Sequence, residues 1–129
     1  MKLLTKELEK KFEKYPLGSQ DELEGNAKVI AKFFNPSGAG TWLITEASKE
    51  GNDWRMFGYV DLGNRQNAEL GYVSLNELQS LKVPPFGLGI ERDLYFPDDI
   101  TLSDACKEEF GYVPDYLLAE EEPDITDDF

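Results

Sequence analysis

The chain has 129 residues, of which 40% are apolar and 12% aromatic, which suits one domain with a single modest core and is too little for two independent cores. It carries 26 Asp and Glu, 13 Lys and Arg, and no histidine. The formal net charge of -13 disfavours direct nucleic-acid binding, which needs clustered Lys and Arg to release counterions from phosphates. The lack of histidine excludes the usual general base, the Ser-His and Cys-His nucleophile pairs, and most zinc sites.

Three stretches of the chain carry helix signals. Thr5 can cap a first helix whose apolar residues recur at a spacing of four, until Pro16 ends it. Ser74 and Glu77 match a capping box in front of a second, short helix. Thr101 or Ser103 can cap a third, short helix near the C-terminus.

Strand-forming residues fill five other stretches, namely 27–34, 41–47, 53–60, 69–73 and 88–96. Simple alternation predicts that Trp42, Ile44 and Glu46 share one face of the second stretch. Alternation also favours core packing for the aromatic residues of these stretches, Tyr95 and Phe96 included, over a role in lining a ligand groove.

The connections between these stretches decide the fold class. Between residues 41 and 73 they are too short for helical crossovers, which favours antiparallel pairing. We therefore predict an α+β fold with a mainly antiparallel sheet of about five strands, on which the N-terminal helix and two short helices pack.

The excess negative charge lies in the last quarter of the chain. Residues 97–129 hold one Lys and twelve Asp and Glu, a net charge of -11, whereas residues 1–34 carry +1 and residues 35–96 carry -3. We predict a single α+β domain at 1–111 and an acidic C-terminal tail at 112–129, which self-repulsion keeps extended in its distal part. Such a charge favours a partner with a cationic surface.

The compartment is indicated by Cys106 and by the hydropathy of the chain. Cys106 is the only cysteine, so no internal disulfide can form, which agrees with a reducing environment. No apolar run reaches the roughly 18 residues of a membrane span, and the charged start of the chain is unlike a secretory signal. We expect a cytoplasmic protein that does not bind membranes.

Carboxylates are the main groups left for catalysis. Asp61 closes one predicted strand, Glu69 opens another, and Glu91 and Asp93 share one face of a third. If these strand ends met at one sheet edge, the carboxylates could hold Mg²⁺ or Mn²⁺ for phosphoryl transfer. The spacing is generic, and strand-end carboxylates are usually exposed or paired with an Arg. The sequence therefore assigns no catalytic residue and no cofactor.

Four runs, TWLITE, FGYVDLG, ELGYVSLNEL and GLGIERDLYF, follow one another at close spacing. Together they resemble a family of small bacterial proteins of unknown function, found mainly on plasmids and conjugative elements. The resemblance covers roughly residues 3 to 105. It implies a mobile-element setting, sometimes beside antirestriction and replication functions, but no established activity and no catalytic residues.

These observations favour a non-enzymatic protein-interaction module that binds a basic surface of a nucleic-acid-handling protein, by imitating the charge of DNA as antirestriction and CRISPR-inhibiting proteins do. The residues expected to contact the partner lie around the last predicted strand and in the tail: Glu91, Arg92, Asp93, Asp115, Glu120, Glu121, Glu122 and Asp124. Two alternatives stay open, the metal-dependent phosphoryl-transfer enzyme and an accessory domain that binds a small ligand. The oligomeric state is not indicated.

Overall fold

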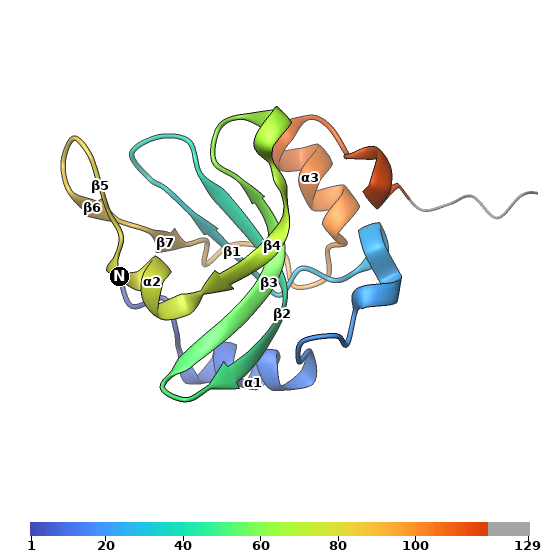
Figure 1. The fold of residues 1–129 in the computed structure, drawn as a ribbon, viewed down its shortest axis with the longest axis horizontal. Coiled ribbons are helices and arrows are strands. Elements are labelled where there is room, and N and C mark those ends of the chain that lie inside the picture. The colour runs from blue at the N-terminus through green and yellow to red at the C-terminus, as the bar shows by residue number, and fades with distance from the viewer. Residues whose placement is uncertain (119–129) are drawn as a thin grey trace, which may run out of the picture.

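A five-stranded antiparallel sheet forms the centre of the fold (Figure 1). The structure is a computed structural model, and it describes residues 1–118. The strand order is β4-β3-β2-β1-β7. Its strands are β1 (Ala31–Phe34), β2 (Thr41–Glu50), β3 (Asp53–Asp61), β4 (Glu69–Ser74) and β7 (Glu91–Arg92). A separate two-stranded hairpin, visible as a protruding loop in Figure 1, consists of β5 (Lys82–Val83) and β6 (Leu88–Gly89).

Three α-helices begin where the sequence predicts them. They are α1 (Lys6–Lys14), α2 (Leu75–Ser80) and α3 (Leu102–Phe110). The side chains of Thr5, Ser74 and Thr101 accept backbone N–H groups in the first turns of these helices, as N-caps do. Short 3₁₀ helices are η1 (Asp21–Asn26), η2 (Arg65–Asn67) and η3 (Asp115–Leu117). Within the described part of the chain, no helix has the length and apolar character needed to cross a membrane.

The sheet is covered on both faces, and each face has its own apolar core. The first core joins α1 and α2 to β1, β2 and β3: its largest members are Leu3, Leu8, Phe12, Phe33, Trp42, Ile44, Trp54, Met56, Leu75, Leu78 and Ile90. The second core joins α3 and η3 to the opposite face: its members are Val29, Leu43, Tyr59, Ile100, Leu102, Ala105, Cys106 and Leu117. The predicted α+β class, with a mainly antiparallel sheet of about five strands, is confirmed.

A β-bulge in β2 places Glu46 on the opposite face from the one predicted. The register of β2 against β3 shifts between Ile44 and Glu46, so that Thr45 is the extra residue. Ile44 stays with Trp42 in the first core, whereas Glu46 pairs with Phe57 on the face of the second core. The predicted common face for Trp42, Ile44 and Glu46 is wrong, because one inserted residue reverses the alternation that follows it.

The buried carboxylate of Glu46 fastens the segment after α1 to this bulge. Glu46 is only 2% exposed, and it accepts the backbone N–H groups of Gly18 at 2.9 Å and Gln20 at 2.7 Å. The buried Gln20 amide in turn donates to the backbone oxygens of Lys28 and Thr45 at 2.9 and 2.7 Å. Every polar group of this small network thus has a partner, as burial requires.

We expect Glu46→Ala to lower the free energy of unfolding by about 3 kcal/mol, because two buried N–H groups would lose their acceptor. Urea unfolding followed by circular dichroism measures this loss. Glu50→Ala is the matched control, since Glu50 lies on the same strand and is exposed. Equal stabilities for the two variants would contradict the role given to Glu46.

Gly58 allows the close approach of β2 and β3 beside the bulge. A Cβ atom at Gly58 would lie 2.0 Å from the backbone oxygen of Leu43, closer than any side chain can pack. Gly71, the partner of Gly58 on β4, has no atom within 4 Å of the corresponding position. Only the first of these two paired glycines is required by packing.

The paired glycines give a second prediction. Gly58→Ala should destabilise the protein by about 3 kcal/mol, since two backbone segments must separate to admit the methyl group. Gly71→Ala should change stability by less than about 0.5 kcal/mol, because its methyl group meets open space. Thermal unfolding of both variants measures the two losses of stability. A Gly58→Ala variant as stable as Gly71→Ala would disprove the packing argument.

The last strand predicted from the sequence, 88–96, is not one strand. Its first part, β6, belongs to the hairpin, and β7 joins β1 at the edge of the main sheet, with Arg92 opposite Phe33. Pairing ends at Asp93, whose side chain accepts the backbone N–H of Tyr95 at 2.9 Å. This Asx turn competes with strand hydrogen bonding. The first predicted strand is shorter too, since β1 starts at Ala31 instead of residue 27.

Candidate interaction site

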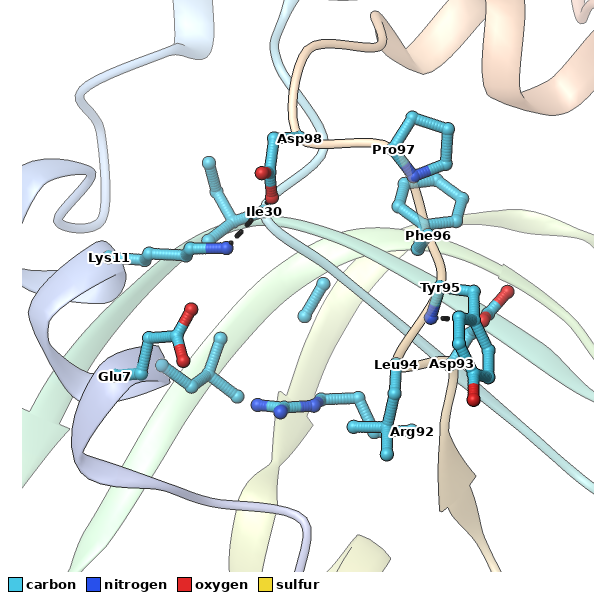
Figure 2. Close-up of a pocket in the computed structure, with 12 residues that line it drawn as sticks. Glu7, Lys11, Ile30, Arg92, Asp93, Leu94, Tyr95, Phe96, Pro97 and Asp98 are labelled. Carbon is cyan, nitrogen blue, oxygen red and sulfur yellow. Dashed lines mark hydrogen bonds and ion pairs between the residues drawn. The ribbon is translucent and has the colours of Figure 1, made fainter.

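A groove of about 370 Å³ lies between α1 and the segment 92–98 (Figure 2). One wall is α1, the floor includes residues next to and within β1, and the other wall is the segment that the Asx turn of Asp93 redirects. The side chains that line the groove are Glu7, Leu8, Lys11, Ile30, Ala31 and those of residues 92–98.

Three ion pairs fix the charged rim of this groove. Lys11 of α1 reaches Asp98 at 3.0 Å (dashed in Figure 2), and its hydrogen bond and charge lower the pKa of the Asp98 carboxyl. Asp93 lies 3.5 Å from the ammonium group of Lys32, which is also 2.8 Å from Glu109 of α3. These contacts hold both ends of the segment 92–98 against the body of the protein.

Arg92 contributes a guanidinium group with unused donors to the same groove. Its side chain extends across the groove towards α1 in Figure 2 and donates one hydrogen bond, to the hydroxyl of Thr5 at 3.3 Å. Among residues 1–118, no carboxylate oxygen lies within 4.0 Å of this group. A guanidinium presents its donors as a planar fork that matches a carboxylate or a phosphate, so Arg92 can receive such a group from a ligand.

Two apolar side chains protrude beside Arg92. Leu94 is 61% exposed and Tyr95 is 95% exposed, whereas Phe96, the next residue, packs against the second core. The segment is therefore anchored at Asp93 and Phe96, and it displays the two residues between them. The alternation pattern predicts core packing for Tyr95, and this is wrong for that residue. The signal that could have revealed it is Asp93, two residues earlier, in the position of an Asx turn.

The four carboxylates considered for a metal site do not come together. Glu69 begins β4 and pairs with Val60, next to Asp61, at one edge of the sheet. Glu91 on β7 and Asp93 after it lie at the opposite edge. In the part of the chain that the structure describes, no group of three or more Asp, Glu, Cys or His side chains is placed to hold a metal ion.

Asp61 instead connects the end of β3 to the start of the predicted tail. Its carboxylate accepts the backbone N–H of Gly63 at 2.8 Å and the hydroxyl of Tyr112 at 3.0 Å. The Tyr112 hydroxyl also lies 2.9 Å from that of Tyr59, and the guanidinium of Arg65 stacks 3.9 Å above the Tyr112 ring. Residues just after α3 are thus fastened to the sheet.

Burial changes the acid–base behaviour of this cluster. It raises the pKa of the Tyr59 hydroxyl well above its ordinary value of 10.0, with a contribution from the hydrogen bond to Tyr112. Burial also raises the pKa of Tyr112, and it raises the pKa of the Cys106 thiol to about 12. A thiol that stays protonated at neutral pH is a poor nucleophile.

These pKa shifts predict the alkaline stability of the protein. A tyrosine with a raised pKa in the folded state contributes stability that is complete below about pH 10, the unfolded-state value, and is lost as pH rises above it. The free energy of unfolding should therefore fall above about pH 10. Tyr112→Phe should lower it by about 1 kcal/mol at pH 7 and make the alkaline fall smaller. Urea unfolding across pH tests this, with Tyr95→Phe as the exposed control.

The residues expected to contact a partner have separate locations. Arg92 and Asp93 line the groove, and Glu91 beside them is half-buried on β7. Asp115 is exposed on η3, which belongs to the other face of the sheet. The remaining four, Glu120, Glu121, Glu122 and Asp124, lie outside the described residues.

Fold and groove together define a small α+β protein whose antiparallel sheet has a helical layer on each face and a charged groove near its β7 edge.

A family model described as a protein of unknown function, DUF2958, matches residues 3–109. The chain belongs to this family. No curated protein and no solved structure matches the chain. The resemblance to a family of unknown function is thereby confirmed, and its mobile-element setting stays a prediction.

Proposed function

We propose that the protein is a non-enzymatic interaction module that binds a partner protein through the groove between α1 and the segment 92–98. The observation that carries this proposal is Tyr95, which is 95% exposed at the end of an anchored turn. Beside it, the guanidinium of Arg92 has no carboxylate partner among the described residues. A turn that is anchored on both sides displays the side chain with a smaller loss of conformational freedom on binding than a free loop would.

Tyrosine and arginine are the residue types that supply most of the energy in protein–protein interfaces. The Tyr95 ring offers a large apolar surface with a polar tip, and Leu94 enlarges that surface. The fork of Arg92 can meet a carboxylate of the partner in the groove, where the protein shields the pair from part of the solvent. These three residues would hold the complex together once it has formed.

The charge around the groove indicates a basic partner surface. Asp98, the last residue of the groove wall, and Asp99, directly after it, have side chains that are 85% and 99% exposed, and they pair with Lys11 and Lys28 at 3.0 and 3.9 Å. Asp104 and Glu108 on the following helix α3 are exposed as well. Exposed acids of this kind accelerate association with a cationic surface and contribute less to the lifetime of the complex. Nucleic-acid-handling proteins carry such surfaces, and the resemblance to mobile-element proteins makes them the first candidates.

Binding to a panel of purified restriction endonucleases and RNA-guided nucleases tests the proposal by biolayer interferometry. We expect a complex with at least one member, weakened by salt because exposed charges are screened beyond about 8 Å at physiological ionic strength. Tyr95→Ala should weaken it about tenfold, mainly through faster dissociation. Phe86→Ala is the matched control, since Phe86 is a 79% exposed aromatic outside the groove.

A second variant separates the charges that accelerate association from the contacts that slow dissociation. Asp99→Asn combined with Glu108→Gln should slow association at low salt and have little effect at high salt. No complex with any panel member at low salt, or a complex that Tyr95→Ala and Phe86→Ala affect equally, would overturn the proposed function.

A further inference from the structure

The edge of the main sheet at β4 is open. Strand β4 pairs with β3 on one side, and no strand of residues 1–118 pairs with its other side. In an antiparallel edge strand, every second residue directs its backbone N–H and C=O away from the sheet. Within the described residues, these outward groups make no other backbone hydrogen bond. The edge therefore offers a row of unpaired donors and acceptors.

The sequence of β4 has only one of the features that usually protect such an edge, the charged Glu69 at its first position. Its residues, ELGYVS, include no lysine and no proline, and its register against β3 is continuous from end to end, without a bulge. The edge at β7 differs, because that strand has only two residues and is protected by its shortness. The six-residue β4 is long enough to template another strand.

Grooves flank β4 on both faces of the sheet and could receive alternate side chains of an added strand. On the face of the second core, a groove of about 420 Å³ has Phe57, Leu70 and Tyr72 on its floor. On the other face, a groove of about 470 Å³ is lined by residues that include Val60 and Leu62. Tyr72 is 60% exposed and Leu62 is 65% exposed, so apolar surface is available on each side.

The charges around β4 select the occupant. A third groove lies at the Ser74 end of β4. The exposed carboxylates that line the three grooves are Asp21, Glu24, Glu50, Glu69 and Glu77. Arg55 is the one cation among the described lining residues, and its guanidinium is stacked 4.3 Å from the Tyr72 ring. A strand with lysine or arginine side chains would meet opposite charge here, whereas a second copy of this chain would bring its own carboxylates against these.

We propose that the edge of β4 binds an extended segment of a partner protein, with basic and apolar side chains in alternation, as an additional strand of the sheet. Backbone hydrogen bonds supply affinity in this mode, and the side-chain grooves supply selectivity. The site is separate from the groove at Arg92, which lies near the opposite edge of the sheet. It therefore goes beyond the proposed function and can be tested independently of it.

The test uses the isotope-labelled full chain and a short synthetic peptide of alternating lysine and valine, followed by two-dimensional NMR. We expect a dissociation constant below about 1 mM, with amide shifts centred on residues 69–74. Two further peptides carry N-methyl groups on one or the other set of alternate residues. Strand addition requires that one of them loses binding and the other retains it, because only one set of N–H groups faces β4.

Charge attraction without strand pairing would leave both N-methylated peptides binding equally, and this result would overturn the proposal. Shifts confined to the acids of 98–108, or no binding at the stated concentration, would overturn it too. In the protein, Tyr72→Lys should weaken peptide binding at least about tenfold by protecting the edge. Phe86→Lys makes the same charge change elsewhere and is its control.

Two outcomes distinguish this site from the groove and from self-association. Tyr95→Ala should leave peptide binding unchanged, so binding to the nucleases and binding to the peptide can fail independently of each other. A dimer seen by sedimentation that Tyr72→Lys dissociates would assign the edge to a second copy of the chain and overturn the proposal. If Tyr72→Lys fails to fold, binding of the two N-methylated peptides to the unaltered chain still shows whether the peptide adds as a strand.

Discussion

The carboxylate of Glu46 is the contact on which the layered structure depends. It lies in the middle of the sheet, directly after the bulge, and satisfies two backbone donors of the segment that leads away from α1. Through Gln20, the same network reaches the chain just before β1. One buried side chain thus connects the segment after α1, the bulge of β2 and the entry to β1. An apolar residue here would fill the space but leave these backbone groups unpaired.

Local chemistry is what the sequence reveals. Thr5, Ser74 and Thr101, the last as one of two candidates with Ser103, identify helix starts correctly because a cap hydrogen bond involves residues only three positions apart. The strands β2, β3 and β4 are also found where alternation and short connections predict them. Antiparallel pairing follows from the loop lengths alone, so the fold class could be predicted without knowledge of any tertiary contact.

Features that depend on distant residues could not be predicted. The bulge at Thr45 requires Gly58 on another strand, and the burial of Glu46 requires donors from a loop before β1. Strand order is also a property of the whole sheet, and it puts Glu69 and Glu91 at opposite edges although both lie at strand ends. The groove is predicted only in part: the sequence points to Arg92 and Asp93, but its alternation places Tyr95 in the core.

The buried Cys106 can report on how often the helix α3 separates from the sheet. The thiol is fully covered in the core between α3 and the sheet, and its raised pKa suppresses the reactive thiolate. Alkylation by a thiol reagent can proceed only when α3 lifts away, so its rate measures how often this layer opens under native conditions. Because it is the only cysteine of the chain, the signal needs no background correction, and any ligand that tightens the α3 layer would slow it.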